Sequence, residues 1–490
     1  MFWNAWGGSV ATFNRRGFLK SSFAGAMGLY TFPSLFPFSK ALAQSSDPAD
    51  VEILLKATKK NVPLLSGDST PMLCYEAELI RGDSRVVTNF QQGFMGPTLR
   101  FQQGQKVKII FQNHLDEKSI IHWHGLHLEE KYDSHPSYAI NANESYVYEF
   151  TVNQRPGTYW YHPHPHGRTA YQIYHGLAGM LIVEGGHESQ YGLPDGQFDL
   201  NFCIQDRLFQ EDNSLSYLQG GGHDLMMGMM GNVLFINGQR PIKQNLSKDA
   251  YRIRLLNGSN ARLYKLAWSD GEPLIIIGND GGLLAAPEQR EYLYLAPGER
   301  VDLYRDFRSF SPSKMVELQS IPFQVGQGDP FTLIPFEVIG DGYTEKTLPS
   351  QFSVIQKLDP SEAINFDSPK KFTLEMTPAT GWTIDGLTYE MKAVREKETV
   401  KLNTMEIWEF ENKMGMPHPI HVHGSQFQVL SRSSKDIGFM DSGWKDTILL
   451  AGGETVRVIK RFDDYTGYFP FHCHNLEHGS MGMMRDFKVI

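Results

Sequence analysis

The chain contains 490 residues, more than a single hydrophobic core usually organises, so we expect two or three domains. Apolar residues make up 41% of the chain, and 46 glycines and 26 prolines separate short Val/Ile/Tyr/Phe runs, which favours an all-β fold rich in turns. The net charge is −9, and without the basic first 43 residues it is −13, with 42 basic and 55 acidic residues, which argues against nucleic acid as a partner.

The first 43 residues carry the features of an export signal. Arg15 and Arg16 of NRRGFLK are followed by an apolar run from 21 to 38 and then by ALA at 41–43. This pattern resembles a twin-arginine signal, and the run, broken by two glycines and two prolines, is too short for a stable membrane span. We therefore expect export to the periplasm by the twin-arginine machinery with cleavage near Ala43, rather than an uncleaved anchor.

Segments with the composition and alternation of β-strands then follow at short intervals, with turn residues between them, which is typical of packed β-sandwiches. They are 106–113, 145–152, 157–162, 179–185, 251–259, 272–280, 300–307, 371–377, 406–412, 427–432 and 455–462.

Two polar stretches rich in Gly and Pro, 184–197 and 339–351, are predicted to be joints. They divide the chain after the signal at 1–43 into three expected domains, 44–190, 191–345 and 346–490. APGERVDLYRDF at 296–307 and AGGETVRVIKRF at 451–462 both pair a Gly-Glu turn with an alternating strand, which supports repeated domains.

Three cysteines are too few for a disulfide scaffold in an exported protein of this size. Cys74 and Cys203 each lie in an apolar strand-like run, where we expect free buried thiols more than a bond between the two. Cys473 lies between two histidines and needs another explanation.

Ten of the 17 histidines, not counting His166, fall in four short motifs. The motifs are HWHG at 122–125, HPHPHG at 162–167, HPIHVHG at 418–424 and HCHNLEH at 472–478. A single His-x-His motif is usually a pair of hydrogen-bonded polar side chains on a strand, but four such motifs in one chain indicate a metal centre.

Cys473 is placed to connect two metal sites. Residues i and i+2 of a strand face one way and residue i+1 the other, so His472 and His474 point away from Cys473. A thiolate with two histidines and a weak methionine is the ligand set of a blue copper electron-transfer centre. His418, His478 and Met483 provide the rest of that set.

The other eight histidines suit a cluster of first-row metals with imidazole ligands. They are His122, His124, His162, His164, His421, His423, His472 and His474. Zinc is the competing metal, but it prefers closed sites with three or four ligands and does not require a thiolate coupled to eight imidazoles.

With these motifs in this order, the sequence resembles a multicopper oxidase of the three-domain laccase type over nearly the whole mature chain. The similarity includes GPTLR at 96–100, GNVLFING at 231–238, GWTIDG at 381–386 and GWKDT at 443–447. The resemblance implies three cupredoxin-like Greek-key β-sandwich domains, with a type 1 copper in the last and a trinuclear copper cluster between the first and the last. It implies an enzyme that passes four donor electrons, one at a time, to O2 to give two waters.

The resemblance also implies a role for each ligand. His418, Cys473 and His478, with Met483 axial, would hold the type 1 copper. His122 and His421 would hold the type 2 copper, His124, His162 and His474 one type 3 copper, and His164, His423 and His472 the other. His166 is expected to lie behind the ligands or to face solvent.

Reduction of O2 consumes protons, so a carboxyl group is expected near the cluster. Asp133, eleven residues after His122, matches the acid that bacterial members of this family keep beside the type 2 site; the alternative is a solvated loop aspartate. A second acid commonly follows the last type 1 histidine, but Gly479 stands there, and Glu477 cannot simply be assumed to replace it.

Two functions of other classes compete with the oxidase. A copper-free periplasmic scaffold for cell division would have lost its histidines, and none is missing here. A copper-storage protein would use the four methionines of HDLMMGMMG at 223–231 as Cu(I) ligands, although such a cluster is more often core filling.

The donor is expected to reach an open type 1 site. Cuprous oxidases that this sequence resembles carry a methionine-rich insertion ahead of HPIHVHG, and residues 372–417 contain none. Met414 and Met416 lie just before His418 and remain candidates to dock Cu(I). We expect a monomer that oxidises phenols and aromatic amines as well as Cu(I), the alternative being a dedicated cuprous oxidase for copper tolerance.

Overall fold

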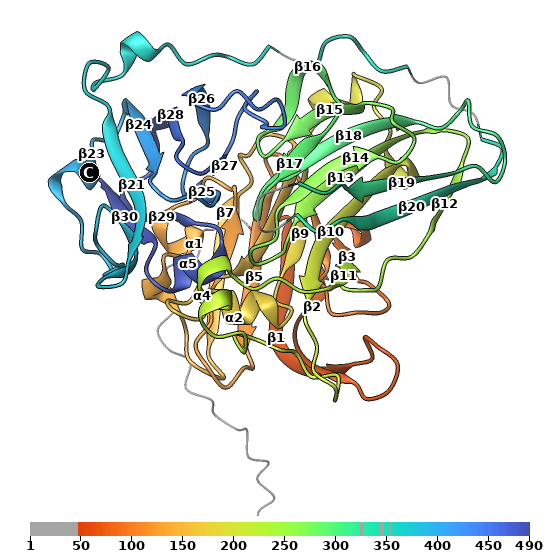
Figure 1. Cartoon of the computed structure of the whole chain (residues 1–490), viewed down its shortest axis with the longest axis horizontal. Helices are drawn as coiled ribbons and strands as arrows, with labels where there is room; N and C mark the ends of the chain where they lie inside the picture. The colour runs from red at the N-terminus through yellow and green to blue at the C-terminus, as the bar shows by residue number, and fades with distance from the viewer. Residues whose placement is uncertain (1–47, 324–327, 343–346, 353) are drawn as a thin grey trace, which may run out of the picture. The chain divides into compact units, whose positions relative to one another are not determined.

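The computed structural model describes residues 48–323, 328–342, 347–352 and 354–490 (Figure 1). Within these ranges the chain forms 30 strands and five α-helices of at most six residues, so the predicted all-β fold is confirmed. None of the helices described is long and apolar enough to cross a membrane. The export signal expected at 1–43 lies outside the described residues.

The strands between residues 51 and 184 form two sheets. The first has the order β2-β1-β5-β7, with β1 (Val51–Val62), β2 (Thr70–Arg81), β5 (Lys106–Asn113) and β7 (Ser145–Thr151). The second has the order β3-β4-β9-β8-β6, with β3 (Val87–Thr88), β4 (Thr98–Gln102), β6 (Ile121–His124), β8 (Gly157–Pro163) and β9 (Gly179–Glu184). Alternate residues of β1 are buried, as expected where one face of a strand packs on a core.

The strands between residues 199 and 340 form the next two sheets. One has the order β11-β10-β13-β18-β15-β16, with β10 (Asp199–Arg207), β11 (Val233–Ile236), β13 (Ala250–Asn257), β15 (Leu274–Asn279), β16 (Gly282–Arg290) and β18 (Arg300–Asp306). The other has the order β12-β20-β19-β14-β17, with β12 (Gln244–Ser247), β14 (Tyr264–Trp268), β17 (Leu293–Leu295), β19 (Met315–Ser320) and β20 (Phe331–Gly340).

The strands between residues 370 and 489 form the last two sheets. One has the order β22-β21-β24-β28-β26, with β21 (Lys370–Thr377), β22 (Gly381–Ile384), β24 (Thr404–Asn412), β26 (Phe427–Arg432) and β28 (Thr455–Phe462). The other has the order β23-β30-β29-β25-β27, with β23 (Thr399–Val400), β25 (His418–Val422), β27 (Thr447–Leu450), β29 (Gly467–Cys473) and β30 (Met484–Val489).

The helices are short connections between strands. They are α1 (Glu130–Asp133), α2 (Thr169–Tyr174), α3 (Gly186–Ser189), α4 (Gly222–Met227) and α5 (Leu476–Ser480). Although α2, α4 and α5 come from distant parts of the sequence, α5 contacts both of the others, and Figure 1 shows the three close together below β29. This junction lies beside the histidine motifs.

Each pair of sheets encloses its own apolar core, and every strand predicted from the sequence lies on an observed strand. The boundaries expected at 190 and 345 fall in the connections between pairs of sheets, but the division into three domains stays a prediction.

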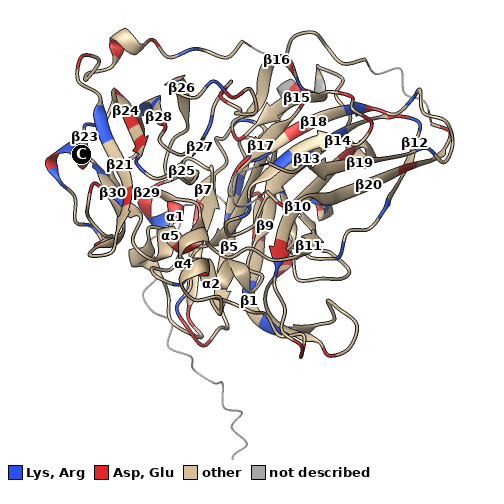
Figure 2. Ribbon diagram, viewed as in Figure 1, with Lys and Arg blue, Asp and Glu red and all other residues tan. Residues whose placement is uncertain are grey.

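Cys74 and Cys203 are free and buried, so they do not pair. Figure 2 shows the positions of acidic and basic residues interspersed along the strands.

Candidate metal centre

Two pairs of strands bring the four histidine motifs together. In the first part of the chain β6 pairs with β8, which places His122 opposite His162. In the last part β25 pairs with β29, which places His421 opposite His472. All ten motif histidines are buried. The nitrogens of nine of them, all except His474, form groups with one another, with Cys473 Sγ or with Asp446 that are compact enough to hold metal ions.

His122 and His421 face each other across the two parts of the chain. His122 Nδ1 donates to the carbonyl oxygen of Asp133 at 2.9 Å, and His421 Nδ1 donates to that of Asp446 at 2.8 Å. Both Nε2 atoms therefore present a lone pair, and they lie 3.4 Å apart. Two lone pairs at this distance repel each other unless a cation lies beside them, so the pair is suited to a metal.

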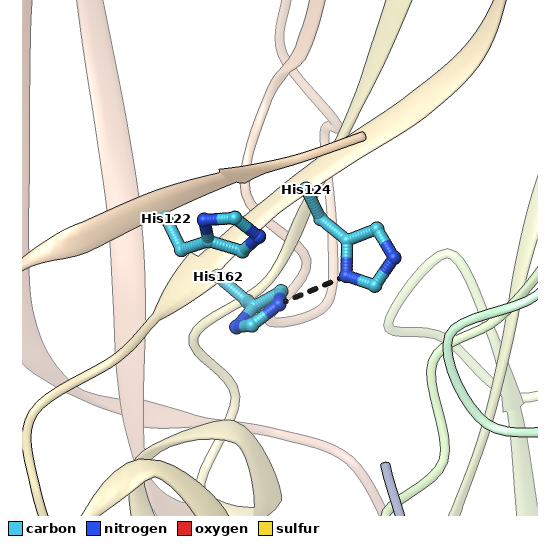
Figure 3. Close-up of side chains that lie close together, drawn as sticks. All are labelled: His122, His124 and His162. Atoms are coloured by element: carbon cyan, nitrogen blue, oxygen red, sulfur yellow. Dashed lines mark hydrogen bonds between the residues drawn. The ribbon is translucent and has the colours of Figure 1, made fainter. Parts of the chain in front are cut away.

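His124, His162 and His474 form a second group, of which Figure 3 shows the first two with His122. His162 Nδ1 donates to its neighbour Pro163 at 3.0 Å, and His162 Nε2 lies 3.3 Å from His124 Nδ1. The ring of His474 lies 5.1 Å from that of His124, and neither of its nitrogens has a hydrogen-bond partner among the described residues. A buried imidazole without hydrogen-bond partners has a nitrogen available to bind a metal, which would satisfy it.

His164, His423 and His472 form the third group. His472 Nδ1 donates to the carbonyl oxygen of Cys473 at 3.0 Å, so its Nε2 is the free acceptor. That Nε2 lies 3.3 Å from His164 Nε2 and 3.3 Å from His423 Nε2. Three imidazole nitrogens thus converge on one point.

The fourth group surrounds the thiol of Cys473. His418 Nδ1 lies 3.4 Å from Cys473 Sγ and 3.4 Å from His478 Nδ1, which lies 3.9 Å from the sulfur. Met483 is fully buried in the same core cluster. Burial raises the pKa of the Cys473 thiol, so a thiolate here needs a cation beside it.

Burial also lowers the pKa of all ten histidines, to about 3 for His162 and His418 and to about 4 for His472. The imidazoles are therefore neutral near pH 7 and ready to bind a metal. The donor set, one thiolate and ten imidazoles, is the set that first-row metals such as copper prefer.

Asp133 ends helix α1 and lies inside the centre, not in a solvated loop. Its side chain is 1% exposed, and its Oδ2 accepts from His423 Nδ1 at 2.8 Å. Its other oxygen, Oδ1, has no hydrogen-bond partner in the described part of the chain. Burial raises the pKa of Asp133 well above its usual range, so this carboxyl group can hold a proton beside the metal ligands.

The middle pair of sheets also contributes to the centre, which the sequence did not reveal. Asp446, in the GWKDT stretch, accepts from His124 Nε2 at 3.0 Å through Oδ1. Arg300 of β18 donates two hydrogen bonds to the same carboxylate, of 2.7 and 2.6 Å. Gly298, at a φ of 85°, lies against His474, where a Cβ would come within 3.0 Å of the ring. Only a glycine permits this approach without strain.

We expect Arg300→Met to destabilise the protein by about 3–5 kcal/mol, because it leaves the buried Asp446 carboxylate without its partner. Burial already raises the pKa of Asp446, and Arg300 opposes that rise. Urea unfolding of the copper-free protein measures the loss. The control is Arg85→Met, whose pair with Asp83 is exposed to solvent and should contribute little to stability. Equal losses in the two variants would contradict the assignment.

The expected opening at the fourth group is not observed. His478 is fully buried, and its Nε2 donates to the carbonyl oxygen of Met226 in helix α4 at 3.0 Å. Trp382 stacks on the His478 ring at 3.6 Å and donates from Nε1 to the carbonyl oxygen of Leu225 at 3.1 Å. The cover therefore comes from the methionine-containing stretch of the middle part of the chain, a source that inspection of residues 372–417 could not reveal.

Glu477 does not take the place of an acid at Gly479. Its carboxylate accepts from the backbone N–H of Met229 and from the side chains of Asn260 and Tyr217, on the side of α4. Gly479 instead lines a small cavity with His164, His472 and the exposed His166. A Cβ at Gly479 would come within 2.8 Å of the carbonyl oxygen of Cys473, so an acid does not fit at this position without a shift of the backbone. His166 stands outside the groups of converging nitrogens.

Comparisons with known proteins agree with this arrangement. Family models described as multicopper oxidase match residues 75–188 and 363–490. The chain is 33% identical to the multicopper oxidase mco of Staphylococcus aureus over 84% of this chain and 86% of that protein. It is 29% identical to a laccase of Bacillus stratosphericus, over 81% and 89%. The crystal structure of the McoA multicopper oxidase of Aquifex aeolicus superposes with a TM-score of 0.79 at 34% identity, over 90% and 96%.

Proposed function

The chain belongs to the multicopper oxidase family, and from this premise we propose how its own residues divide the work. The protein is an oxidoreductase that uses O2 as its electron acceptor and four coppers as cofactors. The coppers supply one-electron oxidation of the donor and four-electron reduction of O2 to water. The residues of the chain bind the coppers, link the copper sites to one another, supply protons for the reduction of O2 and determine which electron donors reach the type 1 site.

We assign the ligands from the converging lone pairs, the single observation that carries the proposal. His418, Cys473 and His478, together with Met483, would hold the type 1 copper. The type 2 copper is held by His122 and His421, one type 3 copper by His124, His162 and His474, and the other by His164, His423 and His472. Copper analysis tests this, since each assigned site predicts one ion and four in all.

Cys473 would connect the type 1 site with the cluster, and the coppers held there would exchange electrons through it. Its sulfur faces His418 and His478, while its peptide neighbours His472 and His474 belong to the other side. The hydrogen bond of 3.0 Å from His472 Nδ1 to the carbonyl oxygen of Cys473 gives a second connection. Both connections between the type 1 site and the cluster start at Cys473, so no other side chain is needed to link the two sites.

Asp133 supplies protons to the O2 side of the centre. It is buried, its pKa is raised, and one of its oxygens is free while the other fixes the His423 ring. A group with these properties can act as a general acid and still orient a ligand.

The cover over His478 favours Cu(I) over phenols among the donor classes we expected. Besides Met226 of α4, four partly buried methionines pack against the type 1 core, namely Met376, Met414, Met416 and Met481. Thioethers are soft ligands that suit Cu(I), and a small ion needs less room than an aromatic ring. Phenols and aromatic amines remain donors, at lower rates.

We expect Met226→Leu and Met416→Leu each to lower kcat/KM for Cu(I) at least tenfold, about 1.4 kcal/mol, and to change the value for a phenol less than twofold. Leucine keeps the bulk and the backbone contact of Met226 but removes the sulfur. O2 consumption with Cu(I), Fe(II) and a phenol measures the ratio. Met315→Leu, at a methionine 52% exposed on β19, is the matched control. Equal loss with both donors would exclude a docking role and leave only packing.

We further propose a monomer of three domains, 44–190, 191–345 and 346–490, exported to the periplasm by the twin-arginine machinery. The paired arginines and ALA at 41–43 support the export, and the three pairs of sheets support the domains. Copper storage is less well supported, because α4 lies against His478 instead of forming a separate cluster.

A further inference from the structure

Helix α1 orients two of the assigned ligands through its last residue. Asp133 accepts from His122 Nδ1 through its carbonyl oxygen at 2.9 Å and from His423 Nδ1 through Oδ2 at 2.8 Å. A hydrogen bond at Nδ1 fixes the rotation of an imidazole ring and leaves its Nε2 free for a metal. A displacement of α1 would therefore move both rings.

Helix α1 cannot hold this position by itself. It has four residues, far fewer than an isolated helix needs to be stable. It ends at Ser134, a residue with a left-handed backbone at a φ of 69°, and such a conformation persists only where the surrounding structure enforces it. Figure 1 shows α1 beside β29, and the contacts that fix it come from the last part of the chain.

The first residue of α1 is fixed by an ion pair and a backbone contact. Glu130 Oε1 accepts from Lys392 Nζ at 2.8 Å, and Glu130 Oε2 accepts from the backbone N–H of Tyr468, in β29, at 3.0 Å. Gly467, at a φ of 134°, permits this approach, since a Cβ there would come within 2.6 Å of Glu130 Oε2. Because the Lys392 side chain is 36% exposed, solvent weakens the ion pair.

His135 and Asp486 of β30 make the second contact, just after the end of α1. Both side chains are 0% exposed, and His135 Nε2 lies 3.0 Å from Asp486 Oδ2. The backbone N–H of Ser137 donates to His135 Nδ1 at 3.2 Å, so Nδ1 is an acceptor and Nε2 carries the hydrogen. His135 Nε2 therefore donates to the Asp486 carboxylate away from water, where a charge-assisted hydrogen bond is strong.

The Asp486 carboxylate has a fixed position of its own. Its Oδ2 also accepts from the backbone N–H of Lys392 at 2.6 Å, and the Tyr389 hydroxyl donates to the carboxylate at 3.3 Å. These donors satisfy a buried charge that would otherwise be costly. Lys392 takes part in both contacts, with its N–H at Asp486 and its ammonium at Glu130, so one stretch of the last part of the chain holds both ends of α1.

We propose that the His135–Asp486 pair fixes the position of α1 and thereby the orientation of His122 and His423. Both members of the pair are positioning residues, because neither belongs to the groups of converging ligand atoms in the described part of the chain. The inference rests on the proposed assignment of His122 to the type 2 copper and of His423 to a type 3 copper. The pair joins the first part of the chain, which provides His122, to the last part, which provides His423.

A second bond of His135 offers another explanation that can be tested separately. His135 Nδ1 caps the short helical turn at Pro136–Tyr138 by accepting from the N–H of Ser137. Asparagine places its side-chain oxygen near the position of Nδ1 and can keep this cap, but it is too short to reach Asp486. Glutamine places its amide nitrogen near the position of Nε2, so it can donate to Asp486 but loses the cap. The two variants thus remove one bond each.

The test is electron paramagnetic resonance of the copper-loaded protein, which resolves the type 2 copper. His135→Asn should change the hyperfine splitting of this copper and weaken its retention against a chelator about tenfold or more, as the loss of a group that orients a ligand usually does. His135→Gln should keep both properties close to wild type, and the blue absorption should stay in both variants. A wild-type type 2 copper in His135→Asn would overturn the proposal, and an altered one in His135→Gln alone would assign the effect to the cap.

Asp486→Ala removes the acceptor and leaves the cap made by His135 intact. It should alter the type 2 copper as His135→Asn does, and a wild-type signal would overturn the proposal even where both His135 variants are altered. The matched control is His175→Asn, which changes a histidine that donates from Nδ1 to the carbonyl oxygen of Tyr171 at 2.8 Å, outside the groups of converging ligand atoms in the described residues. It should leave the type 2 signal and the copper content unchanged.

His122→Ala separates this inference from the ligand assignment on which it rests, since it should remove the type 2 copper. A type 2 signal retained in His122→Ala would show that the assignment is wrong, and the inference would fall with it. Loss of the signal in His122→Ala together with a wild-type signal in His135→Asn would overturn the inference alone.

A readout without copper measures how firmly the two rings are held. In the copper-free protein labelled with ¹⁵N at histidine, the Nδ1–H protons of His122 and His423 should exchange slowly with solvent, because both rings are buried and donate to Asp133. Exchange should be about tenfold faster in His135→Asn and unchanged in His135→Gln. Wild-type exchange in His135→Asn would overturn the proposal.

Discussion

Cys473→Ser is expected to abolish the blue absorption and to lower turnover by at least about 1,000-fold, while the three coppers of the cluster still bind. The serine oxygen is a poor ligand for this copper, and the Cys473 sulfur that it replaces lies 3.4 Å from His418 Nδ1 and 3.9 Å from His478 Nδ1. Absorption spectra, copper content and O2 consumption measure the three effects. The expected copper content falls from four ions to three.

The matched control is Cys203→Ala, which removes another fully buried free thiol, in β10. This variant should stay blue and keep its turnover, because Cys203 lies in an apolar cluster with Met180 and Leu256 and belongs to none of the potential metal-binding groups found in the described residues. A Cys473→Ser protein that remained blue would show that the type 1 assignment is wrong.

Asp133→Asn is expected to slow O2 reduction by about 100-fold or more, a usual contribution of a positioned acid, and to leave reduction of the type 1 copper by donor unchanged. The asparagine oxygen can still accept from His423 Nδ1, so the ligand keeps its orientation while the proton is lost. Stopped-flow measurement of the two half-reactions separates the effects.

Two further variants of Asp133 separate the loss of its proton from the loss of its hydrogen bond. Asp133→Glu keeps a carboxyl group and should recover part of the rate, whereas Asp133→Ala also removes the hydrogen bond to His423 and should lower copper content. Asp116→Asn, at an aspartate 84% exposed, should leave both half-reactions as they are. Equal slowing of the two half-reactions by Asp133→Asn would assign this residue a structural role only.

Much of the fold could be predicted because its signals are local. Alternation of apolar residues over five to eight positions depends only on the pleat of a strand, so segments such as 106–113 and 455–462 were identified correctly. The i, i+2 spacing likewise predicted that Cys473 would face away from its two neighbours, and its sulfur does point to His418. Ligand chemistry is also a property of residue type, which is why the metal centre could be predicted from four motifs.

What the sequence could not provide are contacts between residues far apart in the chain. Arg300 and Asp446 are 146 residues apart, and His478 and Met226 are 252 apart, so no local pattern links them. The expected opening at the type 1 site was wrong for this reason. A six-residue helix from the middle of the chain, α4, covers the site, and no local sequence pattern predicts that its methionines lie there. Lys460 shows the same limit, because alternation marks its face as buried but only packing shows that its amine has no hydrogen-bond partner among the described residues. Residue type and period thus determined the strands and the ligands, whereas the packing of sheets against one another decided what surrounds the metals, since burial and charge pairing depend on the whole folded chain.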